Sequence, residues 1–137
     1  MLQMQWPTRA RVALFGVASF CLMAALPRPA AATEWSLVMV EQAGCSYCAR
    51  WHAEVAPEYP LTPEGQFAPL RVVNLRDLPE DMRFATRPVY TPTFVLSRDG
   101  QEVGRIEGYP GEDFFWSLLD HLLDQADADW TNRETGG

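Results

Sequence analysis

Apolar residues recur along the chain with two different spacings, and four short runs show the pattern of β-strands. These runs are rich in β-branched residues and are bounded by turn-forming glycine, proline and aspartate. The predicted strands cover residues 35–40, 70–75, 93–97 and 101–106. Asp99-Gly100, between the last two runs, is a strong signal for a two-residue turn, so these two strands are expected to form an antiparallel hairpin.

Two further segments carry apolar residues three or four positions apart, as on one face of a helix. The first covers residues 45–59, and Pro57 is expected to kink this helix or end it early. Its apolar stripe consists of Cys48, Trp51, Val55 and Tyr59. The second begins near Glu112, and its stripe consists of Phe115, Leu118, Leu119 and Leu122.

The connections complete the expected layout. Residues 60–69 are rich in proline and glycine and are expected to form a loop, whereas residues 76–90 are expected to contain a short helix at 80–85. The acidic tail, 126–137, is expected to fray. A helix joins the first two strands, which should therefore be parallel. The pattern predicts one α/β domain with a mixed four-stranded sheet flanked by helices.

The first 32 residues resemble a secretory signal peptide, with Arg9 and Arg11 before an apolar segment at 12–26. Small residues, Ala30 and Ala32, precede the expected cleavage site. The mature domain is then 33–137, and a periplasmic location follows from its export. A retained N-terminal membrane anchor is the alternative interpretation of this segment.

Charge narrows the possible functions. Removal of residues 1–32 takes away three of the 11 basic residues and none of the 18 acidic ones, which leaves eight positive against 18 negative charges, a net charge of −10. This argues against nucleic acid as a partner, because phosphates require a basic surface. The chain contains no lysine, which excludes a lysine base or Schiff base.

Two of the three cysteines, Cys45 and Cys48, remain in the predicted mature chain, just after Gly44 and at the start of the first helix. Free amides and the positive end of the helix dipole stabilise a thiolate at that place, so Cys45 is the expected nucleophile. Cys48 lies one turn further along, where it can resolve a mixed disulfide by attacking Cys45. A disulfide that closes so short a loop adds little stability, which favours a redox role.

Two other interpretations of the cysteine pair stay open at this point. Cys45, Cys48 and His52 supply three potential metal ligands, although a structural zinc site takes four. The first interpretation is therefore a metal site, and the second is a purely structural disulfide. Covalent haem attachment is excluded because Ala49, and not histidine, follows the second cysteine.

A second motif, "YTPTFVLSRDGQEVGRIEGYPG", follows the cysteines, with Pro92 44 residues beyond Cys48. The strand, CxxC and helix, followed by this strand–hairpin–strand–glycine–helix order, resemble the thioredoxin superfamily over most of residues 35–125. The segments "VEQAGCSYCARW", "RPVYTPTFVL" and "EVGRIEGYPGEDFFW" are most similar to the small periplasmic thioredoxins of bacterial sulfur-oxidation (Sox) systems.

The resemblance implies a thioredoxin-like fold and a periplasmic thiol–disulfide oxidoreductase with a redox-active Cys45–Cys48 disulfide and no cofactor. It implies that Pro92 follows a cis peptide bond near the sulfurs and that the backbone of Thr91 pairs with an extended substrate segment. Tyr47 is expected to be exposed and to contact the partner. The implied partners are a protein thiol or disulfide, in particular the Sox sulfur-carrier protein, and a membrane electron donor that re-reduces the chain.

The chain departs from a typical thioredoxin at several positions. Ser46-Tyr47 replaces Gly-Pro between the cysteines, so a strongly reducing potential does not carry over. Met39 stands where the family buries an acidic residue, and Glu41 is expected at the strand end in solvent. His52 is either a residue of the helix boundary or a group that tunes Cys48. The alternative functions are a disulfide oxidase or isomerase, a Cys/His metal-binding module, and a non-catalytic scaffold.

Overall fold

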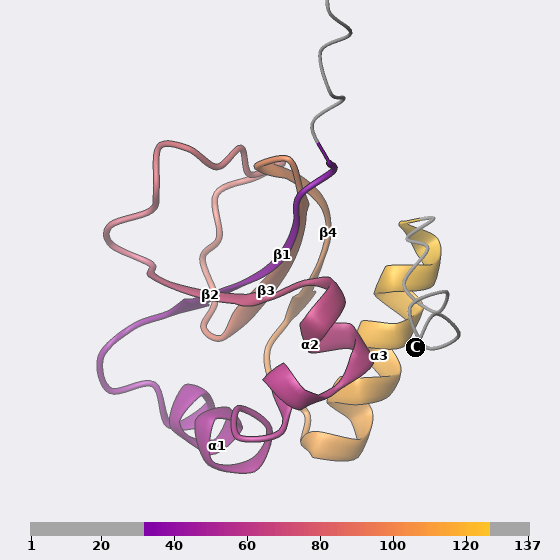
Figure 1. Cartoon of the computed structure of the whole chain (residues 1–137). Helices are drawn as coiled ribbons and strands as arrows, with labels where there is room; N and C mark the ends of the chain where they lie inside the picture. The colour runs from indigo at the N-terminus through magenta and orange to yellow at the C-terminus, as the bar shows by residue number, and fades with distance from the viewer. Residues whose placement is uncertain (1–31, 127–137) are drawn as a thin grey trace, which may run out of the picture. The chain divides into compact units, whose positions relative to one another are not determined.

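The computed structural model describes residues 32–126, which form a four-stranded sheet with its helices (Figure 1). All but the last residue of the predicted signal peptide, and all but the first of the predicted frayed tail, lie outside this range. The elements, in chain order, are β1 (Trp35–Glu41), α1 (Ser46–Glu54), the 3₁₀ turn η1 (Tyr59–Leu61), α2 (Pro63–Phe67), β2 (Leu70–Asn74), β3 (Thr93–Arg98), β4 (Gln101–Glu107) and α3 (Glu112–Gln125). No helix within 32–126 combines the length and the apolar character that a membrane span requires.

The strand order in the sheet is β2-β1-β3-β4. β1 and β2 are parallel, β1 and β3 are antiparallel, and β3 and β4 form the predicted hairpin. The hairpin turn has positive φ at both Asp99 (53°) and Gly100 (75°), the backbone that an Asp-Gly pair adopts most readily. The mixed sheet predicted from the sequence is therefore confirmed.

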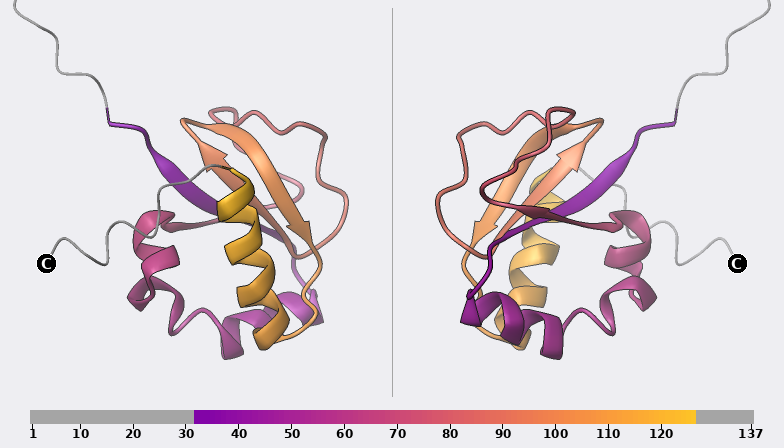
Figure 2. Two further views of the ribbon diagram at one scale, coloured as in Figure 1. Left: turned by 90° about the vertical axis from the view of Figure 1, so that its right-hand side faces the viewer. Right: turned by 90° about the vertical axis from the view of Figure 1, so that its left-hand side faces the viewer.

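Both faces of the sheet are buried, which explains the continuous apolar run of β1. Leu37 and Met39 face a core shared with the helices, whereas Val38 and Val40 face a smaller core that includes Met82. Figures 1 and 2 show α1, α2 and α3 on one side of the sheet and the segment between β2 and β3 curling over the other. Within residues 32–126, the helices thus flank one face of the sheet.

The prediction of a helix at 80–85 was wrong. These residues instead run alongside the end of the β-hairpin. The backbone N–H of Arg83 donates to the carbonyl of Gly100, and the carbonyl of Arg83 accepts from the N–H of Glu102. Met82 and Phe84 point into the smaller core, so the apolar residues follow a period of two. Pairing with the hairpin therefore overrode local helix propensity.

The prediction of a loop at 60–69 was also wrong, since η1 and α2 occupy most of this segment. Thr62 caps α2 by accepting a hydrogen bond from the N–H of Gly65 at 3.1 Å, and Pro63 takes the first helical position, where its missing N–H costs nothing. The hydroxyl of Tyr59 donates to the carbonyl of Ala68 at 2.7 Å and ties the segment together.

The two long helices keep most of their predicted faces. α1 ends at Glu54, earlier than expected, because Pro57 prevents its continuation, and all four residues of its apolar stripe are buried. In α3 the prediction for Leu118 was wrong, because this side chain is 41% exposed, and Leu123 is buried instead. A stripe of Phe115, Leu119, Leu122 and Leu123 follows the 3.6-residue period more closely.

Candidate active site

The sheet register brings the two sequence motifs together. Val40, near the end of β1, pairs with Thr93 at the start of β3, because these strands are antiparallel. The cysteines follow β1 and Pro92 precedes β3, so both motifs lie at the same edge of the sheet. The N–H of Gly108 donates to the carbonyl of Pro92 at 2.8 Å, which adds the loop after β4 to this edge.

A tight turn delivers Cys45 to the amino end of α1. Gly44 has φ of 79°, a conformation that residues with a Cβ seldom adopt. Cys45 is the N-cap residue, and its Sγ accepts a hydrogen bond from the N–H of Cys48 at 3.1 Å. The first turn of α1 contains no acidic residue, so the positive end of the helix is left to act on the sulfur.

The two sulfurs differ in accessibility. Cys45 and Cys48 form a disulfide with their Cα atoms 5.3 Å apart. Cys45 is half-buried, whereas Cys48 is 3% exposed and belongs to the large core. Met39, on the strand beneath, is completely buried in the same core. Of the two sulfurs, Cys45 alone is open to a large partner, because Cys48 is almost completely buried.

The Thr91–Pro92 peptide bond is cis, as the resemblance implies, and Pro92 is buried. Thr91 is tied to the loop before the cysteines, since its Oγ1 accepts a hydrogen bond from the side-chain amide of Gln42 at 3.2 Å. Sequence reasoning missed Gln42. Its one signal was its position, as a polar side chain between the end of β1 and the CxxC motif.

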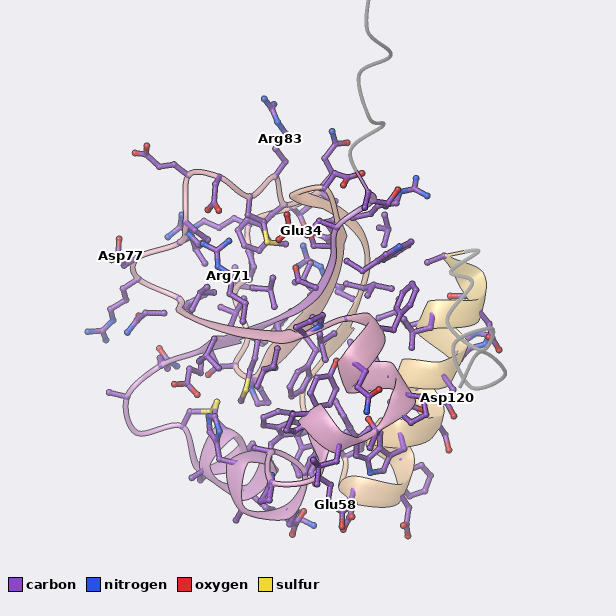
Figure 3. All side chains as sticks on the ribbon, in the orientation of Figure 1. Glu34, Glu58, Arg71, Asp77, Arg83 and Asp120 are labelled. Atoms are coloured by element: carbon purple, nitrogen blue, oxygen red, sulfur yellow. A yellow bond between two sulfur atoms is a disulfide. The ribbon has the colours of Figure 1, made fainter. Side chains whose placement is uncertain are left out.

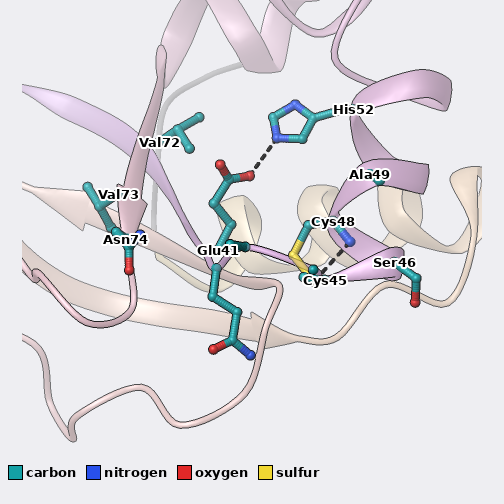
Figure 4. Close-up of a pocket in the computed structure, with 12 residues that line it drawn as sticks. Glu41, Cys45, Ser46, Cys48, Ala49, His52, Val72, Val73 and Asn74 are labelled. Atoms are coloured by element: carbon teal, nitrogen blue, oxygen red, sulfur yellow. Dashed lines mark hydrogen bonds and ion pairs between the residues drawn. A yellow bond between two sulfur atoms is a disulfide. The ribbon is translucent and has the colours of Figure 1, made fainter.

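A pocket of about 730 Å³ opens beside the disulfide, between α1 and the ends of β1 and β2 (Figure 4). We call it the disulfide pocket; it is lined by both cysteines and by Glu41, Gln42, Ala43, Gly44, Ser46, Ala49, His52, Val72, Val73 and Asn74. Glu41 lies at the strand end as predicted. It is not free in solvent, however, because its Oε2 lies 2.6 Å from Nε2 of His52.

A second depression, of about 710 Å³, contains two of the predicted substrate-binding residues. We call it the aromatic groove; it is lined by Tyr47, Tyr90, Thr91, Glu107, Gly108, Tyr109, Pro110 and Leu118. Tyr47 is 58% exposed, as expected. Tyr47 and Thr91 thus line one groove, whereas the sulfurs line the disulfide pocket.

The predicted alternative of a metal site gains no support from the geometry. Within residues 32–126, no group of three or more His, Cys, Asp or Glu side chains is placed to hold a metal ion. His52, the proposed third ligand, directs Nε2 at Glu41.

The comparisons with known proteins agree with this geometry. A family model described as a thioredoxin-like domain matches residues 24–123. The chain belongs to the thioredoxin-like family. Its CxxC pair, disulfide-bonded in the structure, is that of a thiol–disulfide oxidoreductase.

Among solved structures, this thioredoxin-like chain is similar to the periplasmic thioredoxin SoxS from Paracoccus pantotrophus in its reduced form. The two are 55% identical, the match covers 68% of this chain and 99% of the other, and the TM-score is 0.66. The resemblance to the Sox thioredoxins is thereby confirmed. No curated protein matches the chain.

Within the thioredoxin-like domain, a charged network braces α1 against the loop after β4. Arg50 Nε donates to Glu54 at 2.9 Å, and the hydroxyl of Tyr109 donates to the same carboxylate at 2.6 Å. The hydrogen bond from Tyr109, and then that from Arg50, lowers the pKa of Glu54. Burial, and then the Glu54 carboxylate, raises the pKa of Tyr109.

Glu54→Gln is expected to lower the melting temperature at neutral pH, and the loss should fade in acid. A carboxyl group whose pKa is lowered by folding stabilises the native state above its unfolded pKa, about 4.3, and loses this effect as the pH falls through the lower folded value. Melting curves between neutral pH and about pH 3 test this.

The matched control is Glu58→Gln. The Glu58 side chain points outward at the lower edge of Figure 3, and its carboxylate has no ion pair or hydrogen bond within the described residues. This variant should melt like the wild type throughout the pH range. An equal loss in both variants would show that general charge, and not the Arg50–Glu54–Tyr109 network, sets the stability.

Proposed function

We propose that this chain is a periplasmic thioredoxin that reduces a disulfide, or a mixed disulfide, on a partner protein. The observation that carries the proposal is the asymmetry of the sulfurs: half-buried Cys45 caps α1, and Cys48 lies buried directly behind it. Such a pair can attack a partner and then release it.

The proposed reaction has two displacement steps. The Cys45 thiolate attacks one sulfur of the partner disulfide, and the other partner sulfur leaves as a thiolate that takes a proton from water. Cys48 Sγ then loses its proton and attacks Cys45 Sγ, which expels the second partner sulfur. The partner gains two electrons, and the chain is left with the Cys45–Cys48 disulfide.

The aromatic groove is the proposed docking place for the partner segment. Tyr47 and Thr91 line it, and Pro92 lies buried beside them, immediately before the start of β3. An extended segment that pairs with the backbone of Thr91 would bring its sulfur towards Cys45. In this proposal Cys45 and Cys48 carry out the exchange, and Tyr47, Thr91 and Pro92 hold the substrate.

The 55% identity with the periplasmic thioredoxin SoxS supports a periplasmic location and a role in the Sox system. The signal-like segment 1–32 is in keeping with export followed by cleavage after Ala32. The proposed partner is the thiol-bearing sulfur-carrier protein of the thiosulfate-oxidising system. Because no thiol buffer holds the periplasm reduced, a membrane electron donor must re-reduce the chain.

The test is catalysed reduction of a protein disulfide. Mature wild-type protein, with a chemical dithiol as electron source, is expected to accelerate the reduction and precipitation of insulin. Cys45→Ser is expected to show only the uncatalysed rate, because the attacking sulfur is gone. Oxidation of reduced proteins by the wild type without any insulin reduction would favour the oxidase alternative. Stoichiometric, tightly held zinc or copper without redox activity would favour the metal-binding module.

A further inference from the structure

Cys48 must lose a proton before it can attack, and its surroundings work against this. The side chain is 3% exposed and packs in the core with Met39 and Trp51. Burial among apolar groups disfavours a thiolate. A group that takes the proton at neutral pH would therefore speed the release of the partner.

The disulfide pocket contains such a group. Among its lining residues, the titratable side chains other than the cysteines are Glu41 and His52. Glu41 comes from the end of β1, and His52 follows Cys48 by four positions on α1, so both cysteine and histidine lie on the same side of the helix. Figure 4 shows the Glu41–His52 pair facing the pocket above the disulfide.

The pair has room for one additional proton. With 2.6 Å between Glu41 Oε2 and His52 Nε2, one proton lies between these atoms. A second proton converts the imidazole to an imidazolium that stays next to the carboxylate. Histidine is the side chain that most often takes up and returns a proton in general acid–base catalysis.

The other charged side chains on α1 and β2 near the pocket form ion pairs of their own. On α1, Arg50 and Glu54 pair with each other. On β2, Arg71 pairs with Asp81, and the β2 side chains that line the pocket, Val72, Val73 and Asn74, carry no charge. The Glu41–His52 pair is thus the one proton-exchanging group on the described walls of the disulfide pocket.

We propose that the Glu41–His52 pair exchanges the proton of Cys48 during the resolving step. The inference rests on the proposed function and assigns this pair a role that the family resemblance does not supply. The proton of Cys48 Sγ passes through water in the open pocket to the pair, which becomes imidazolium and carboxylate. The thiolate then attacks Cys45 Sγ. In the reverse reaction, the pair returns the proton to Cys48 as the disulfide opens.

The two displacement steps can be timed separately with dithiobis(nitrobenzoate). Reduced protein is mixed with an equal amount of the reagent in a stopped-flow instrument. Attack by Cys45 releases the first coloured thiolate, and attack by Cys48 on the mixed disulfide releases the second. His52→Gln retains a side-chain donor towards Glu41 but cannot take up a proton.

His52→Gln is expected to slow the second release about tenfold or more at neutral pH and to leave the first unchanged. In the wild type, the second rate should rise with increasing pH, because the pair must be free to accept the proton of Cys48. In the variant, that rise should shift to higher pH, because the buried Cys48 thiol must then ionise without this pair. Glu41→Gln should also slow only the second release.

The matched control is His121→Gln, which changes the other histidine of the chain, on α3 and outside the disulfide pocket. It should keep wild-type rates in both steps. Equal slowing of both releases by His52→Gln, or no slowing with an unchanged pH profile, would overturn the inference while the proposed function stands. A wild type that releases only one thiolate would instead overturn the proposed function.

Discussion

Cys48→Ser is expected to accumulate a mixed disulfide with the partner protein through Cys45. The substitution leaves the half-buried Cys45 free to attack but removes the sulfur that would release the partner. In a periplasmic extract of a thiosulfate-oxidising bacterium, we expect a complex that disappears on reduction and contains the Sox sulfur carrier. Non-reducing gels followed by mass spectrometry of the excised band measure this.

The matched variant is Cys45→Ser, which keeps Cys48. Because Cys48 is buried, this variant should trap at least about tenfold less partner. If Cys45→Ser traps as much as Cys48→Ser, the roles of the two sulfurs are reversed. Capture of many unrelated envelope proteins by Cys48→Ser would point to a general reductase or isomerase.

Trp51→Ala is expected to cause the largest loss of stability. The indole is completely buried, and its ring centroid lies 5.2 Å from that of Phe94 and 5.7 Å from that of Phe115. Truncation of a buried tryptophan costs about 3–5 kcal/mol. For a domain of this size that corresponds to a fall in melting temperature of roughly 15–30 °C. Thermal unfolding followed by circular dichroism measures the shift.

Two companion variants separate packing from other effects. Trp51→Phe should cost far less than Trp51→Ala, because the ring is mostly retained and the indole N–H has no acceptor among the described residues. Phe114→Ala, on the exposed side of α3, should change the stability by no more than about 0.5 kcal/mol. A Trp51→Ala protein that melts like Phe114→Ala would show that α1 is not held by this aromatic cluster.

Local patterns were enough to predict the strands, the hairpin and the cysteine-bearing helix. Each depends on residues close together in the sequence: the apolar run of β1, the Asp99-Gly100 turn, and the stripe around Trp51. The same holds for Cys45, because a strand, a glycine and a helix start define its position at a helix terminus. The resemblance carried by Thr91 and Pro92 completed the candidate site.

Long-range pairing decided what local patterns could not. The segment at 80–85 has enough helical character to suggest a short helix, yet its backbone pairs with Gly100 and Glu102 and its apolar residues cover the sheet. Leu118 fits a helical stripe in the sequence, but because of the way α3 lies against β4 its side chain lines the aromatic groove.

The contacts around the disulfide also required the tertiary structure. Gln42 meets Thr91 across 49 positions of the chain, and Tyr109 meets Glu54 across 55. Glu41 meets His52 because the turn at Gly44 folds α1 back beside the end of β1. The sequence by itself determined which residues carry the thiol chemistry. Only the register of the strands and the orientation of α1 decided which polar groups surround it, because both depend on packing between segments far apart in the chain.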